Sequence, residues 1–319
     1  MDRRRALRLL ATGAAAGTAG VAVASKAVKA SAATEAVKLP PAAVGMLYDA
    51  TKCIGCKTCV VACADANGLP RDTGASDGLY QAPVSLNSKT KNVIKLYREG
   101  AEQSFMKAQC MHCLEPACAT ACMMHALRKD EQTGIVSWEG SKCVGCRYCQ
   151  VACPFGVPQF EWSSYNPRIV KCELCRERLK EGKQPACVEV CPRNAVIYGK
   201  REDLLAEAHR RIKENPSLYV HKVYGETDGG GTQVLYLSHV PFEKLGLPAL
   251  GERPTDATVR NVQGTLYYGF LAPLALYGGL AFVVNRNRRK QEEAGAKWKP
   301  EAEEEGKPGA CEAEGKEDA

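Results

Sequence analysis

The residues of this 319-residue chain that are best suited to chemistry are its cysteines, of which there are seventeen. Cys143, Cys146, Cys149 and Cys153 follow the spacing C-x2-C-x2-C-x3-C, with Pro154 directly after them. Thiolates at this spacing bind 4Fe-4S cubanes, because three closely spaced thiolates hold one cluster while the fourth reaches a different cluster. One such run therefore implies a partner run elsewhere in the chain.

Three further quartets are present. One repeats the same spacing, one has four residues in its middle gap and one has eleven. Their members are Cys53, Cys56, Cys59 and Cys63, then Cys110, Cys113, Cys118 and Cys122, then Cys172, Cys175, Cys187 and Cys191. Sixteen cysteines thus form four quartets, enough for four 4Fe-4S clusters with four thiolates each, and only Cys311, an incidental reduced thiol in this interpretation, is left over.

Other uses of cysteine fit the pattern less well. Tetrahedral zinc needs only two C-x2-C pairs, so the additional cysteines of each run would have no role. Cysteines three residues apart close loops poorly, which disfavours a disulfide framework even in an exported chain. Covalent c-type haem requires C-x-x-C-H, and no cysteine pair here is followed by His. His112 lies between Cys110 and Cys113, and we expect it to line a cluster pocket rather than to be a ligand.

Composition and charge exclude a nucleic-acid partner. The formal net charge is +7, but residues 1–32 carry a net +5, which leaves +2 for the remainder. Four oxidised clusters with their thiolates would add about −2 each and make the total negative. Only 7% of residues are aromatic, and no basic patch is interleaved with stacking side chains. With so few aromatics, clusters must replace part of a hydrophobic core, so we expect the domain to unfold when iron is removed.

Basic residues stand next to cysteines in several quartets. Positive charge and N–H donors at such positions raise cluster reduction potentials. For roughly half of them we expect the plainer alternative, a solvated surface charge. The six are Lys52, Lys57, Lys142, Arg147, Lys171 and Arg176.

The first 32 residues are expected to be a targeting segment. Arg3 and Arg4, followed by Leu7 and Arg8, resemble a twin-arginine signal, although Ala6 stands where that motif usually has Phe. An apolar stretch rich in Ala and Gly and a small-residue cleavage site come next. The twin-arginine route exports folded proteins, which suits clusters assembled in the cytoplasm. An uncleaved membrane anchor is the alternative.

The elements that must position the cysteines are short. A strand is expected in GMLYD before the first quartet, another over Asn92–Tyr97, and a hairpin with its turn at Thr133–Gly134 before a strand over 135–138. A helical run should fill the long gap of the last quartet and end at Gly182. Beyond it, 201–216 reads as an amphipathic packing helix and 234–237 as a strand. The insertion over 65–99 has no predicted chemistry.

This pattern predicts an α+β fold. The four-cluster ferredoxin-like domain covers 45–200, in which an inner two-cluster module at about 105–160 is inserted in an outer one. Residues 201–260 extend that domain. The two nested bacterial-ferredoxin-like modules are followed by one C-terminal transmembrane helix.

That helix is predicted over 265–284, which contain no charge and match a bilayer core of about 30 Å. A buried core helix is the alternative, disfavoured by Pro273 and the missing polar face. Arg286, Arg288, Arg289 and Lys290 follow at once, so the positive-inside rule places the C-terminus in the cytoplasm. The tail over 285–319 is charged and predicted to be disordered.

Together these features resemble the iron-sulfur subunit of membrane-bound nickel-iron hydrogenase of the hydrogenase 2 type. The resemblance rests on the quartets, the twin-arginine segment, the pieces QCMHC, KCELC, CVEVCP and YGETDGGGTQV, and the C-terminal apolar helix, and it runs from the signal to Arg289. It implies that the quartets pair first with fourth and second with third, each fourth cysteine crossing over. The implied ligand sets are set one, Cys53, Cys56, Cys59 and Cys191; set two, Cys63, Cys172, Cys175 and Cys187; set three, Cys110, Cys113, Cys118 and Cys153; and set four, Cys122, Cys143, Cys146 and Cys149.

The chain departs from the family pattern in one respect. Pro154 and Pro192 follow their cysteines as expected, whereas Ala64 and Met123 follow theirs. The departure leaves ligation intact and is expected to alter the shielding of clusters two and four.

The resemblance implies a non-catalytic electron-transfer subunit. Electrons would pass between nickel-iron hydrogenase small and large subunits and an integral membrane quinone-reactive subunit, on the periplasmic face of the inner membrane, with a single-pass anchor in the lipid bilayer. The residues support this, since they include no nucleophile with a positioned base, no open metal site and no nucleotide fingerprint. A formate dehydrogenase or molybdopterin oxidoreductase β subunit is one alternative, and a structural metal-binding scaffold is another.

Overall fold

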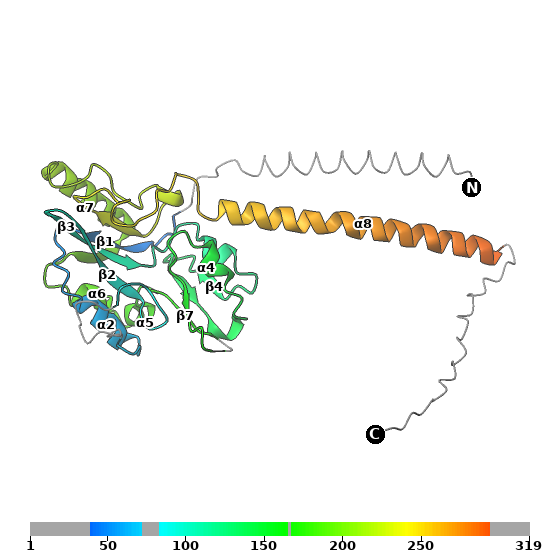
Figure 1. The fold of residues 1–319 in the computed structure, drawn as a ribbon, viewed down its shortest axis with the longest axis horizontal. Helices are drawn as coiled ribbons and strands as arrows, with labels where there is room; N and C mark the ends of the chain where they lie inside the picture. The colour runs from blue at the N-terminus through cyan, green and yellow to red at the C-terminus, as the bar shows by residue number, and fades with distance from the viewer. Residues whose placement is uncertain (1–38, 72–82, 165–166, 294–319) are drawn as a thin grey trace, which may run out of the picture. The chain divides into compact units, whose positions relative to one another are not determined.

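The computed structural model describes residues 39–71, 83–164 and 167–293. The predicted signal, part of the 65–99 insertion, the end of the tail and Cys311 lie outside these residues. The chain divides into two compact units between Thr265 and Leu266 (Figure 1). The first unit holds all four quartets.

A three-stranded sheet organises the first unit. The predicted strand before the first quartet is β1, Val44–Asp49, and it lies at the centre of the sheet in the order β8-β1-β9. Strand β8, Val196–Lys200, pairs with it antiparallel, and β9, Val234–Leu237, pairs with it parallel. Because β1 precedes the first quartet and β8 follows the fourth, this pairing places the two ends of the cysteine-bearing chain side by side.

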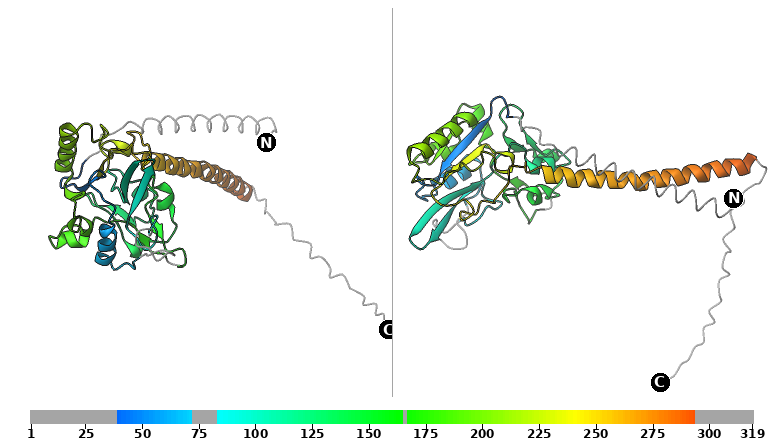
Figure 2. Two further views of the ribbon diagram at one scale, coloured as in Figure 1. Left: turned by 60° about the vertical axis from the view of Figure 1, so that its left-hand side comes forward. Right: turned by 90° about the horizontal axis from the view of Figure 1, so that it is seen from above.

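Both faces of the sheet are covered. On one face Leu47 and Leu235 pack against Leu204 and Ala208 of helix α7, Arg201–Glu214, the predicted amphipathic helix. On the other face lie the first and last quartets with helices α2, Thr58–Ala66, and α6, Ala186–Glu189 (Figure 2). Alternation along β1 sends its side chains into two separate cores, so the strand is buried on both sides.

A long hairpin lies next to the cysteine loops. The predicted strand at Asn92 is β2, Asn92–Glu99, and it pairs in full with β3, Glu102–Gln109, which sequence reasoning missed. The turn uses Gly100 at φ 58°, a conformation that glycine adopts without penalty. The Tyr48 hydroxyl donates to the Phe105 carbonyl oxygen at 2.8 Å and fastens the hairpin to β1.

The remaining elements are short, as expected around metal clusters. The predicted hairpin is present, with β4, Leu127–Lys129, β5, Val136–Trp138, and Gly134 at φ 74° in its turn. The helical run predicted in the last quartet is α5, Arg176–Lys180, and it ends before Gly182, which has a φ of 73°. The other short elements are β6, Gln159–Phe160; β7, Ile169–Val170; α3, Ala117–Thr120; α4, Tyr148–Ala152; α5, Arg176–Lys180; and the 3-10 turns η1, Gly140–Lys142, and η2, Asp228–Gly230. The mixture of helices and strands confirms the α+β class.

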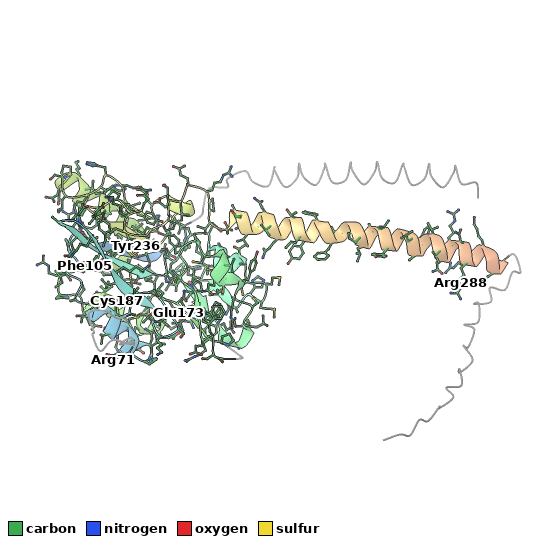
Figure 3. The ribbon with its side chains drawn as sticks, viewed as in Figure 1. Arg71, Phe105, Glu173, Cys187, Tyr236 and Arg288 are labelled. Carbon is green, nitrogen blue, oxygen red and sulfur yellow. The ribbon has the colours of Figure 1, made fainter. Side chains whose placement is uncertain are left out.

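Helix α8, Ala257–Glu293, contains the predicted span. It is the one helix in the described part of the chain that is long and apolar enough to cross a membrane, and none of its apolar window is buried. The helix begins before Thr265 and continues past Val284, so the predicted tail starts as helix rather than as disordered chain. Arg288 and Glu292, one turn apart, form an ion pair that suits this extension (Figure 3).

Candidate iron-sulfur sites

Two cysteine loops share one backbone design. In the first quartet Gly55 and Lys57 have φ values of 70° and 58°, and in the third Gly145 and Arg147 have 71° and 61°. These left-handed residues stand on either side of the second cysteine of each quartet, and α2 or α4 begins directly after them. The third cysteine of each quartet therefore lies on the first turn of a helix.

The other two quartets replace part of that turn with a proline-led helix. Pro116 precedes α3 and Pro185 precedes α6, and the third cysteine is the second residue of each helix. Proline suits this place because its fixed φ matches helix entry and the first N–H needs no partner. The long gap of the last quartet is thus accommodated by α5 without changing the local geometry of its third cysteine, Cys187, which is buried in the first unit (Figure 3).

Backbone N–H groups point at the cysteine sulfurs. The N–H of Ala126 donates to Cys122 Sγ at 3.2 Å and that of Ala195 to Cys191 Sγ at 3.3 Å. The first cysteines of the first and last quartets have similar donors. The Gly55 N–H donates to Cys53 Sγ and the Leu174 N–H to Cys172 Sγ, both at 3.4 Å. Such donors stabilise thiolate and cluster charge, so the surroundings of these sulfurs suit cluster ligands.

The members of set one line one small cavity. Its walls include Cys53, Cys56, Cys59 and Cys191, with Tyr48 and Pro192 beside them. Burial raises the pKa of the Cys53 thiol, and the neighbouring Cys191 thiolate raises it further. The fourth cysteine of the last quartet therefore lies with the first three of the first quartet.

Set two is brought together in the same crossed manner. Burial raises the pKa of Cys63 to about 12; Lys107 opposes this rise, and the Cys187 and Cys175 thiolates add to it. The pKa of Cys172 is raised by burial and then by Cys63 and Cys187.

Sets three and four repeat this arrangement in the middle of the chain. The pKa of the Cys113 thiol lies well above its usual value because of burial and the thiolates of its set-three partners, Cys110, Cys153 and Cys118. Burial raises the pKa of Cys149 to about 12, with further increments from its set-four partners, Cys122, Cys146 and Cys143.

Electrostatic contacts also join successive sets. The Cys187 thiolate of set two raises the pKa of Cys59 in set one, where burial is the larger cause. In the same way Cys110 of set three acts on Cys172 of set two, and Cys149 of set four acts on Cys118 of set three, in each case after burial. Side-chain packing gives the same neighbours. Cys187 shares a buried cluster with Cys59, Cys172 shares one with Cys110, and Cys149 shares one with Cys118. The sets therefore follow one another in the order one, two, three, four.

A single tetrahedral metal ion needs its ligands gathered around one point. Among the residues that the structure describes, no three His, Cys, Asp or Glu side chains form a group able to hold one metal ion. A cubane distributes its thiolates over four irons, so they stand farther apart than the ligands of a single zinc.

His112 is held in place by a backbone hydrogen bond, and pocket lining stays a prediction for it. Its side chain is fully buried, and Nδ1 accepts a hydrogen bond from the Val136 N–H at 3.0 Å. Burial lowers its pKa well below the usual value, with Lys171 adding to the effect. His112 therefore orients the loop between Cys110 and Cys113 as a neutral ring.

The six basic residues beside cysteines differ in burial. Lys171 is 2% exposed, Lys142 is exposed, and the other four are partly exposed. Sequence reasoning missed a second buried lysine, Lys107 on β3, because it stands outside every quartet. Its only signal was a charge within the otherwise apolar run FMKA.

The base of α8 lies against the helices of the middle quartets. Val259 packs on Ala117 and Ala121 of the α3 segment, and the Gln263 side-chain amide donates to the Thr120 carbonyl oxygen at 3.3 Å. Arg260 and Glu115 add an ion pair at 3.1 Å. Sets three and four therefore lie nearest to the start of this helix.

Comparison with known proteins agrees with the site. A family model described as a 4Fe-4S dicluster domain matches residues 101–201. Over 289 residues the chain is 40% identical to the hydrogenase-2 operon protein HybA of Escherichia coli O157:H7, covering 80% of this chain and 88% of that protein. A protein of Nitratidesulfovibrio vulgaris Hildenborough is 41% identical over 303 residues, covering 92% and 80%.

More distant relatives come from another oxidoreductase. The iron-sulfur subunit of the nitrate-inducible formate dehydrogenase of Escherichia coli K12 is 34% identical over 249 residues, covering 75% of this chain and 82% of that protein. The hydrogenase-2 operon protein therefore shares more residues with this chain than the formate dehydrogenase subunit does.

Proposed function

The chain belongs to the family of the hydrogenase-2 operon protein HybA, and from that membership we propose that it carries electrons between nickel-iron hydrogenase subunits and an integral membrane quinone-reactive subunit. It is an electron-transfer iron-sulfur subunit. The observation that carries the finer proposal is the line of four thiol sets leading to the base of α8.

We propose that each set binds one 4Fe-4S cluster, giving four. The support is the crossed grouping of the thiols and the N–H donors aimed at their sulfurs. Sets one and two would form an outer ferredoxin-like module and sets three and four an inner one, as the antiparallel pairing of β1 with β8 and of β4 with β5 suggests. Bound clusters supply reversible one-electron transfer.

The protein's own residues position and shield these clusters. Of the fourth cysteines, Cys63 is buried, and Ala64 after it is also buried, so the missing proline leaves set two shielded. Met123 after Cys122 is 70% exposed, so the departure affects set four more.

The proposed electron path along the four sets has a direction. Because α8 starts beside sets three and four, the proposed membrane end is set four, and set one faces the hydrogenase subunits. Large apolar side chains are exposed next to the set-four cysteines in sequence, notably Met124, Val144 and Val151. Exposed apolar surface of this kind suits an apolar partner. From the expected export signal and the basic residues after the span, we infer that the cluster domain lies on the periplasmic side and the C-terminus in the cytoplasm.

A membrane assay separates an electron carrier from a scaffold. Replacing Cys146 by Ser in set four should abolish hydrogen-dependent quinone reduction while the assembled complex still oxidises hydrogen with a soluble dye. Replacing exposed Ser141 by Ala is the matched control and should retain both activities. Quinone reduction at the normal rate in the Cys146→Ser complex would contradict the electron-carrier proposal and favour a docking scaffold. The use of formate instead of hydrogen by the native complex would assign it to the formate dehydrogenase alternative.

A further inference from the structure

Lys107 is a buried cation without a hydrogen-bond partner on its ammonium group among the described residues. Its side chain is fully buried. Its backbone belongs to β3 and is held there by the Tyr236 hydroxyl, which donates to the Lys107 carbonyl oxygen at 2.6 Å. The negative groups that act on its charge are thiolates: Cys59 of set one, and Cys187 and Cys63 of set two, with Cys172 after them. Ile94, which lies opposite Lys107 in the hairpin, lines the cavity that holds set one. Together with the thiolates that act on its charge, this contact puts Lys107 beside sets one and two.

Lys171 occupies the equivalent place one step along the line. Its ammonium group donates to the carbonyl oxygens of Val136 and Cys172, the latter at 2.8 Å, and lies 3.8 Å from Cys110 Sγ. Cys172 belongs to set two and Cys110 to set three. The side chain is 2% exposed, so solvent hardly screens its charge.

The other charged groups near these lysines do not account for their burial. Glu173 acts on Lys171, but its carboxylate accepts from Lys91 at 3.2 Å and from the Trp138 N–H at 3.0 Å. No carboxylate is among the main groups acting on Lys107. Burying an ammonium group is costly unless negative charge compensates it. The compensating charge available to Lys107 is that of the two thiol sets and whatever they bind.

The third buried base of the described residues differs from these two. Arg201 donates to the backbone carbonyls of Thr232 and Glu226 in the loop beside α7. The charged groups that act on it are Glu226 and Glu202 rather than cysteine thiolates, so its role is to hold that loop. Among the described residues, sets three and four share no buried lysine or arginine of the kind found between sets one and two and between sets two and three.

We propose that Lys107 and Lys171 are fixed cations shared by successive clusters, Lys107 by clusters one and two and Lys171 by clusters two and three, and that they raise the reduction potentials of those pairs together. The proposal rests on the four-cluster function proposed above. With clusters bound, one electron would pass from one cluster to the next, and the lysine would keep its proton throughout. Because one charge attracts the added electron on either neighbour, it raises both potentials and leaves the driving force within the pair small.

The test is a potentiometric titration of the full-length protein in detergent, followed by electron paramagnetic resonance, with iron content measured on the same samples. Lys107→Met and Lys171→Met remove one charge at nearly constant volume, and Lys107→Gln and Lys171→Gln keep an N–H donor. Lys95→Met is the control, because Lys95 lies on the same hairpin as Lys107, pairs with Met106 in register and is exposed.

The expected pattern is specific. Each lysine variant should lower the reduction potentials of two clusters. One cluster should belong to both pairs, so the double variant should lower the reduction potentials of three clusters. At a fixed solution potential, the ratio of reduced to oxidised affected cluster should fall on the order of tenfold, the effect of one charge in a poorly screened site. The fourth cluster, and all four in the Lys95→Met control, should stay unchanged.

Other results would overturn the proposal and indicate which part failed. Full iron with unchanged potentials, or with equal shifts at all clusters, would refute the shared-cation role and leave the four-cluster function intact. Loss of iron in both the Met and the Gln variant of a lysine would show that it holds the fold rather than the potentials, which also refutes the role. Wild-type protein with far fewer than about sixteen irons would instead refute the four-cluster function.

Discussion

The guanidinium of Arg211 on α7 lies 2.9 Å from the carboxylate of Asp49 at the end of β1, and the Asp49 side chain has no exposed surface. This ion pair ties the amphipathic helix to the strand that leads into the first quartet. Replacing Arg211 by Ala would leave a buried carboxylate without its cation. We expect the free energy of unfolding to fall by about 3 kcal/mol, measured by thermal or chemical denaturation of the cluster-loaded protein.

Arg210, the next residue on α7, supplies the control. Its side chain is 54% exposed and pairs with Glu207 and Glu214 on the helix surface. Replacing Arg210 by Ala should cost less than about 1 kcal/mol. Equal losses in the two variants would contradict the importance of the buried pair.

Glu207 gives the same helix a pH dependence. Hydrogen bonds from Arg210 lower the pKa of Glu207 to about 2; burial opposes this, and Arg211 adds to the lowering. Because the folded pKa is depressed, the stabilisation is complete above the ordinary glutamate value of about 4.5 and is lost as pH falls toward 2. We expect the difference in melting temperature between wild type and Glu207→Gln to be constant from about pH 7 to 5 and to shrink below about pH 4.5.

Wild type and Glu207→Gln share the acid sensitivity of the clusters, so that sensitivity cancels in the difference between their melting temperatures. A melting-temperature difference that stayed constant down to about pH 3 would contradict the assignment of this pH dependence to Glu207.

The first cysteine loop depends on Gly55. Its φ is +70°, and a Cβ there would lie 2.2 Å from the ring of Phe105. Gly55→Ala should therefore combine left-handed strain of about 1–2 kcal/mol with a steric clash and should reduce the iron bound by set one. Iron analysis after anaerobic reconstitution would show a loss of up to about four irons per chain.

Gly68 is the matched control for this substitution. It has φ +59° but no atom within 4 Å of an added Cβ, so Gly68→Ala tests the backbone strain alone. Full iron is expected in Gly68→Ala. Similar iron loss in both variants would show that backbone strain, and not the contact with Phe105, limits the loop.

The crossed pairing of quartets predicts which variants share a phenotype. Cys63 stands in the first quartet but lies with Cys175 and Cys187. Cys63→Ser and Cys172→Ser should therefore alter the same electron paramagnetic resonance signal, and Cys53→Ser should alter a different one. Grouping of Cys63→Ser with Cys53→Ser would mean that each quartet binds its own cluster.

The sequence predicted the local structure of the sites well because cluster ligation depends on cysteines that are only a few residues apart. The four quartets were recognised from these spacings alone, and the structure adds a left-handed turn at Gly55 or Gly145 followed by a helix. The hairpin turn at Gly134 and the end of α5 at Gly182 were predicted for the same reason, since each depends on one residue's backbone freedom.

What sequence reasoning missed depends on distant contacts. Strand β3 has the same mixed polarity as a loop, and it becomes a strand because β2 pairs with it and Tyr48 and Tyr236 hold it from the sheet. Lys107 on that strand carries no motif, and its burial follows only from the packing of two quartets around it. For Lys171 the position beside Cys172 suggested tuning, but not that the side chain reaches a second set.

The central claim is that four clusters in this one chain accept electrons that come from hydrogen. The most direct measurement is a quantitative count of reduced clusters in the purified hydrogenase complex under hydrogen, by electron paramagnetic resonance, alongside iron analysis of this chain. The account predicts about sixteen irons and about four reducible clusters per chain, with no reduction by hydrogen of the chain purified alone. Clusters that dithionite reduces but hydrogen leaves oxidised in the intact complex would contradict it.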